Sequence, residues 1–148
     1  MFNFEKLEVW RESIEFADSV YTFTRKFPDS ERFGLTNQMR RAAVSISSNI
    51  AEGSSRSSRT DFGRFIEIAT GSLFEVISQA TISKRQGFLS EADFKNLYSA
   101  CEKQSKMLSG LRTVSYTHLD VYKRQIQDRK STRLNSSHPS RSRMPSSA

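Results

Sequence analysis

Apolar residues recur every three or four positions over residues 7–26, which predicts an amphipathic α-helix with two apolar stripes. One stripe consists of Leu7, Trp10, Ile14, Ala17 and Tyr21. The other lies about 120° round the helix and consists of Val9, Phe16, Val20, Phe23 and Phe27. A helix that packs on one core needs a single apolar face, so we interpret the second stripe as a candidate subunit interface. The alternative is that both stripes face one core.

The same spacing predicts three further helices, which begin near residues 35, 59 and 91. Ser58 and Ser90, each followed three residues later by aspartate, match N-caps. Gly53 is expected to end the second helix and Gly87 the third, and Gly34 is a natural place for a positive φ. Helices of this length with short connections predict an all-α fold, an antiparallel up-down-up-down four-helix bundle.

Small residues crowd the second predicted helix, whereas bulky apolar residues fill the third, so the two backbones are expected to approach closely. Gly71 and Ser72 interrupt the third helix near its middle. A mid-helix glycine costs about 1 kcal/mol relative to alanine, and close packing against a neighbour is the expected compensation. Cys101 falls on the core face of the fourth helix, which indicates a buried apolar residue and not a nucleophile.

The net charge of +7 is spread unevenly along the chain. Residues 1–112 hold 16 Lys and Arg against 14 Asp and Glu, whereas residues 113–148 hold 7 against 2. No stretch approaches the roughly 20 apolar residues that cross a bilayer, and the first residues lack the features of a signal peptide. We therefore expect a cytoplasmic protein with no membrane partner.

Residues 113–148 show no helical period and end in a stretch rich in Ser and Arg, which predicts a disordered tail. Two strings in it, VSYTHLDVYKRQ and DRKSTRLNSSHPSRSRMPSSA, resemble translated sequencing-adapter read-through. On that interpretation the reading frame leaves the gene near Arg112, and the domain is residues 1–112. We therefore expect the tail to carry no function.

Three segments of residues 1–112 are distinctive: FEKLEVWRESIEF, FPDSERFGLTNQMRRAAVSISSNIAEGSSR and FGRFIEIATGSLFEV. Together they resemble the bacterial 23S rRNA intervening-sequence family, also called the S23 family. The resemblance implies a four-helix bundle that assembles as a homopentamer. The family also includes relatives that assist diversity-generating retroelements by binding nucleic acid and a reverse transcriptase. This chain is more similar to the intervening-sequence members.

Arginines around the second and third predicted helices form a candidate nucleic-acid surface, which a ring would repeat. The candidate residues are Arg40, Arg41, Arg56, Arg59 and Arg64. Arg56 and Arg59 fall in a Ser-rich turn whose hydroxyl and amide groups can also meet phosphates. The alternative interpretation is an oligomeric protein-interaction scaffold, in which the arginines form a solvated face or inter-subunit ion pairs. In either case the chain itself is the first expected partner, with RNA, DNA or another protein as the second.

Enzymatic function is the least favoured class. Residues 1–112 contain no histidine, the commonest general base and metal ligand, and the paired Glu-x-x-His motif of di-iron bundles is missing. The EGSSRSS segment lacks the glycine spacing and the lysine of a phosphate-binding loop. We therefore expect no catalytic residue, no metal site and no cofactor.

Overall fold

The computed structural model describes the backbone of residues 1–136 and the side chains of residues 1–114 and 125–133. This part of the chain is all-α, as predicted. It contains the α-helices α1 (Glu8–Thr24), α2 (Leu35–Ser54), α3 (Arg59–Arg85) and α4 (Glu91–Ser136). Two short 3-10 helices, η1 (Asn3–Lys6) and η2 (Asp29–Glu31), precede α1 and α2.

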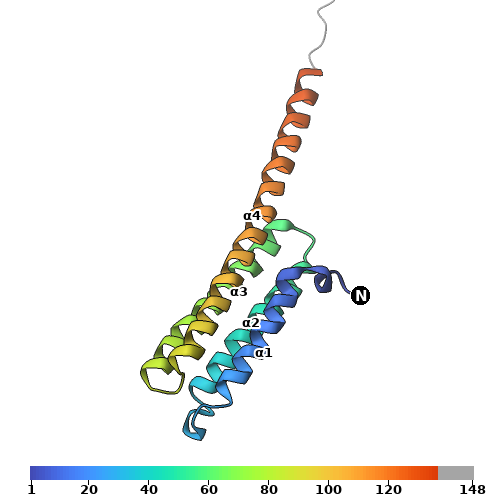
Figure 1. Ribbon diagram of the computed structural model, residues 1–148. Coiled ribbons are helices and arrows are strands. Elements are labelled where there is room, and N and C mark those ends of the chain that lie inside the picture. The colour runs from blue at the N-terminus through green and yellow to red at the C-terminus, as the bar shows by residue number, and fades with distance from the viewer. Residues whose placement is uncertain (137–148) are drawn as a thin grey trace, which may run out of the picture.

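The four α-helices lie side by side, and the chain reverses direction at each connection between them (Figure 1). Helix α1 packs against α2 and α4, α2 packs against α3, and α3 packs against α4. Each helix sends fully buried apolar side chains into the space between them, including Val20, Ile46, Leu73 and Leu97. Burial of these side chains is the main force that holds the helices together.

The predicted starts of α3 and α4 and the predicted end of α3 are confirmed. The Ser58 hydroxyl accepts a hydrogen bond from the Asp61 amide at 3.0 Å, and the Ser90 hydroxyl accepts one from the Asp93 amide at 3.1 Å. Gly87 follows α3 with φ of 76°, a conformation that glycine adopts without steric cost.

Gly53 and Gly34 serve different purposes from those predicted. Gly53 does not terminate α2 but lies buried within its last turn, where an added Cβ would sit 2.6 Å from the Cβ of Phe65. Gly34 has φ of −105°. A Cβ there would collide with the Glu31 carboxylate, which accepts a hydrogen bond from the Leu35 amide at 3.0 Å. Both glycines therefore make room for a neighbouring group.

The interpretation of the second α1 stripe as a subunit interface is wrong. Val9, Phe16, Val20 and Phe27 are 0–7% exposed and belong to the core of the chain itself, with Phe23 partly buried against it. The first stripe lies at the edge of the core, since Trp10 and Ile14 are half-buried and Tyr21 is exposed. Both stripes are buried to different extents because α1 packs between α2 and α4.

Several polar side chains lie between α2 and α3. The Ser45 and Ser72 hydroxyls are 2.9 Å apart, and the Ser83 hydroxyl lies 3.6 Å from the Met39 sulfur. The Asn49 amide donates back to the Ser45 carbonyl at 2.7 Å, within α2. These hydroxyl and amide groups thus have partners, whereas the side-chain oxygen Oε1 of Gln79, in the same region, is buried without one among the described residues.

Helix α4 continues past the other helices as a single rod (Figure 1). Residues 113–136 are helical, which differs from the disordered tail expected there. The chain has neither glycine nor proline between Gly110 and Pro139, and extending an existing helix avoids the cost of nucleation. Residues 137–148 lie outside the described residues.

Candidate nucleic-acid interface

The turn between α2 and α3 is held in place from both sides. On the α2 side, Gly53 lets the backbone approach Phe62 and Phe65 of α3. On the α3 side, Ser58 caps the helix, so the amides of the first turn are partly satisfied by its hydroxyl. The Ser and Arg side chains between these two points therefore project from a fixed backbone.

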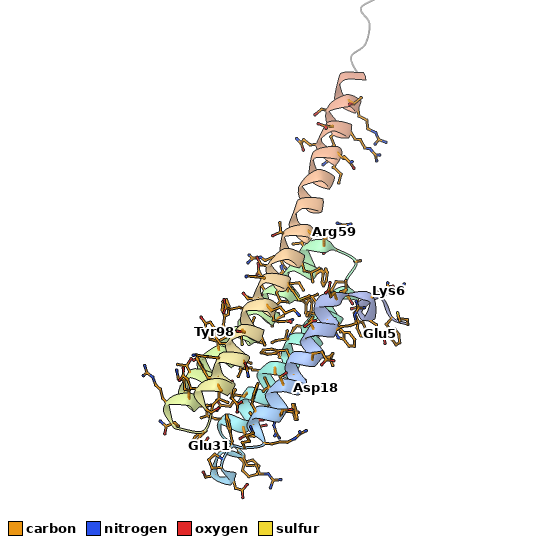
Figure 2. The ribbon with its side chains drawn as sticks, in the orientation of Figure 1. Glu5, Lys6, Asp18, Glu31, Arg59 and Tyr98 are labelled. Carbon is orange, nitrogen blue, oxygen red and sulfur yellow. The ribbon has the colours of Figure 1, made fainter. Side chains whose placement is uncertain are left out.

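A hollow of about 190 Å³ opens at this turn. Its surface is mostly apolar, with hydroxyl and guanidinium groups among the lining residues Asn3, Leu7, Gly53, Ser54, Arg56, Ser57, Ser58, Arg59 and Phe62. Arg59 lies at the end of the molecule where α4 leaves the other helices, the same end as Lys6, and Glu31 lies at the opposite end (Figure 2). Hydroxyl and guanidinium groups together can hold an anionic oxygen.

The three arginines near the turn differ in how much of their charge is available. Arg56 pairs with Glu52 at 3.2 Å and places its guanidinium 4.8 Å from the centre of the Phe65 ring. Arg64 lies 3.6 Å from the Asp61 carboxylate. Arg59 is exposed and makes no ion pair with the described side chains. The charge of Arg59 is therefore the one most open to a ligand.

Arg40 and Arg41 belong to a different part of the surface. They precede Ser54 by more than three turns of α2, which places them roughly 20 Å from the turn. The Arg40 guanidinium donates to the Thr24 hydroxyl at 2.9 Å and stacks 4.6 Å from the centre of the Tyr21 ring. Arg41 is exposed and has no ion pair among the described side chains. The five predicted arginines therefore form two groups and not one continuous patch.

The ion pairs of Arg56 and Arg64 with acidic neighbours could have been expected from the sequence, but the predicted surface did not take them into account. Glu52 precedes Arg56 by four residues and Asp61 precedes Arg64 by three, and side chains at these spacings are neighbours on a helix. The stacking of Arg56 on Phe65 and of Arg40 on Tyr21 depends on the packing of two helices. No spacing within one helix could have indicated it.

The thiol of Cys101 is 1% exposed, as expected for an apolar core residue. Burial raises the pKa of Cys101 to about 12, so the thiol stays protonated and unreactive. Glu67 pairs with Arg112 at 2.7 Å. Among the described residues, no group of three or more His, Cys, Asp and Glu side chains is placed to bind a metal ion. None of the described helices has the length and apolar character that spanning a bilayer requires.

The sequence model of the 23S rRNA-intervening sequence protein family matches residues 5–110. The segment expected to be read-through lies outside this match. The chain is also similar to a solved structure, a protein with unknown function from the S23 ribosomal protein family of Bacteroides thetaiotaomicron VPI-5482. The two share 22% identity with a TM-score of 0.66, over 71% of this chain and 95% of that one. No curated protein matches the chain.

Proposed function

The chain belongs to the 23S rRNA-intervening sequence protein family, and from this we propose that it is a non-enzymatic, homo-oligomeric protein that binds the phosphate backbone of RNA or DNA. The contact would be made at the α2–α3 turn by Arg56, Arg59 and the neighbouring serines. The observation that carries the proposal is the exposed Arg59 at the start of α3, which has no ion pair among the described side chains.

The turn has several features that favour phosphate. Phosphate contacts in protein–nucleic-acid complexes come mostly from Arg and Lys, from hydroxyl groups and from helix N-termini. All three occur around the hollow, since α3 begins at Arg59 and its positive dipole end points into the same region. Arg56 is 46% exposed in its side chain, so its guanidinium can exchange Glu52 for a phosphate oxygen. The turn has no recognisable base-reading motif, so the proposed binding would be independent of sequence.

We further propose that the packed helices form an antiparallel up-down-up-down four-helix bundle, and that copies of it assemble as a ring, a homopentamer by resemblance to the family. The reversal of the chain at each connection and the pairwise packing of α1 to α4 support the bundle. A ring would bring several copies of the turn onto one surface, so that weak phosphate contacts add up.

A protein-interaction scaffold is the second candidate. Two observations favour it: Arg56 and Arg64 are already paired with acidic neighbours, and Phe33 is 86% exposed beside η2. A large exposed aromatic side chain is typical of the central residues of protein–protein interfaces. The turn arginines would then be dispensable for function.

The test is binding of a generic structured RNA, measured by fluorescence anisotropy at about 50 and about 200 mM salt. The double variant Arg56→Gln/Arg59→Gln is compared with Arg25→Gln/Arg85→Gln, which removes two exposed charges elsewhere on the helices. Both are made in the full chain and in residues 1–112, so that the basic tail is controlled. Phosphate binding at the turn predicts that only the first variant loses affinity, with a salt slope smaller by about 2.

Equal loss in both variants would show that net charge alone drives binding, and would refute the turn as the contact. No binding by the unmodified protein at the lower salt would favour the scaffold. Binding of a partner protein that is insensitive to both double variants would support the same conclusion.

A further inference from the structure

The side of α3 that faces away from the core carries large apolar side chains. Ile68 is 53% exposed, Phe74 is 57% exposed and Ile82 is 46% exposed. None of them lies at a position of the core stripe of α3, which runs through Ile66, Leu73 and Val76, among others. We define the α3 outer face as Ile68, Gly71, Phe74, Glu75 and Ile82.

Gly71 lies at the centre of this face. It is three residues from both Ile68 and Phe74, so on the helix surface it leaves a saddle between them. A Cβ added to Gly71 would meet nothing within 4 Å. The close packing predicted for this glycine is therefore not provided by any described residue of the same chain. A glycine in the middle of a helix, flanked by exposed apolar side chains, fits the close approach of a helix from another molecule.

A complementary surface lies across α1 and α2. A hollow of about 610 Å³, here called the α1–α2 hollow, is lined by side chains of both helices: Tyr21, Asn37, Arg40, Arg41, Val44, Ser45 and Ser48. Tyr21 is 38% exposed and Val44 is 41% exposed, so the hollow has apolar walls. Its small serines leave space for a large side chain such as Phe74.

The charges of the two surfaces are also complementary. Glu75 on the α3 outer face and Arg41 in the α1–α2 hollow are both exposed, and neither makes an ion pair among the described side chains. Both line a further hollow of about 400 Å³ between α2 and α3, yet they do not pair with each other there. One chain thus carries an acidic apolar face and a basic apolar hollow, and the charges of Glu75 and Arg41 stay without an ion-pair partner among its described side chains.

We infer that the α3 outer face of one copy docks into the α1–α2 hollow of the next copy, with Phe74 entering the hollow and Glu75 pairing with Arg41. This inference rests on the homo-oligomer of the proposed function and names the surfaces that build it. The alternative pairing of α3 with α3 across a twofold axis would set Glu75 close to its own copy, which like charges disfavour. Contact between two different faces generates a closed ring when the rotation closes.

The first experiment measures the mass of the full chain by light scattering over a dilution series. Phe74→Ser and Ile82→Ser are compared with Tyr98→Ser, which removes an exposed aromatic side chain of α4, outside both surfaces. Circular dichroism checks that each variant is folded. Docking through the α3 outer face predicts that the first two variants raise the dissociation constant by about 30-fold or more, while Tyr98→Ser leaves it unchanged.

The second experiment tests the charge pair between copies. Glu75→Arg and Arg41→Glu should each weaken assembly, because each sets like charges against one another. An equal mixture of the two single variants should regain much of the assembly, since the arginine at position 75 of one variant can then meet the glutamate at position 41 of the other. The two variants must alternate, so one contact of a five-membered ring would still set like charges against one another. Contact within one chain cannot produce this rescue, because neither chain in the mixture carries both changes.

The results distinguish failure of the docking inference from failure of the proposed homo-oligomer. An oligomer that Phe74→Ser and both charge variants leave unchanged overturns the inference but keeps the homo-oligomer. A wild-type chain that stays monomeric throughout the dilution series overturns both.

Discussion

Replacing Gly53 with alanine should destabilise the fold, although alanine is the better helix former. The added Cβ would lie 2.6 Å from the Cβ of Phe65 and 2.8 Å from Cδ2 of Phe62. Carbon atoms pack best at about 3.5–4.0 Å, so α2 and α3 would have to separate by about 1 Å. The Phe65 Cβ is bonded to the α3 backbone and cannot move away by a change of rotamer.

Two terms set the size of the effect. Overpacking in a close-packed core typically costs about 1–3 kcal/mol. The change from glycine to alanine inside a helix contributes about 1 kcal/mol in the opposite direction. The measured destabilisation should therefore be about 0–2 kcal/mol.

Gly110→Ala provides the matched control, because Gly110 is exposed within α4 and an added Cβ there meets nothing within 4 Å. That variant should gain about 1 kcal/mol. The difference between the two variants isolates the steric term, so the free energies of unfolding should differ by about 1–3 kcal/mol. Urea unfolding followed by circular dichroism at one protein concentration measures both. If Gly53→Ala is as stable as Gly110→Ala, the close approach of α2 to α3 at Phe65 is refuted.

Two further predictions concern α4 and the start of α3. Because burial raises the pKa of Cys101 from 9.0 to about 12, the folded state binds the thiol proton more tightly than the unfolded state. Folding stability should therefore fall as the pH rises above about 9, and Cys101→Ala should remove that part of the slope in urea unfolding; an unchanged slope would argue against burial of the thiol. Ser58→Ala removes the hydroxyl that caps α3 and should lower the free energy of unfolding by about 1 kcal/mol. A urea midpoint equal to that of the wild type would show that the cap contributes nothing.

Short-range sequence patterns predicted the structure correctly where the feature depends on the residues of a single helix. The caps at Ser58 and Ser90 and the positive φ of Gly87 follow from a few adjacent residues, and all three are present in the structure. The helical periods placed the core of α3 and α4 correctly for the same reason, as the burial of Leu73 and Leu97 shows.

The incorrect predictions concern residues whose surroundings depend on how two helices pack against each other. The stripe of Val9 and Phe16 is buried because of where α2 and α4 lie, which the period of α1 cannot reveal. From the sequence alone, Gly53 is expected to end α2, but its role in the structure depends on Phe65 of the next helix. At the candidate site, the exposure of Arg59 and the stacking of Arg56 likewise became visible only with the packed helices.

The contacts along α2 and α3 also have a consequence for the uniqueness of the fold. Ser45 meets Ser72 near the middle, Met39 meets Ser83 towards one end, and Gly53 receives Phe65 at the other. A slip of α3 along α2 by one helical turn, about 5.4 Å, would break all three at once. Shifted pairings that keep the apolar stripe in contact would separate the Ser45 and Ser72 hydroxyls and push a side chain against the α2 backbone. These contacts therefore fix the alignment of α3 along α2, whereas hydrophobic burial alone would permit several alignments.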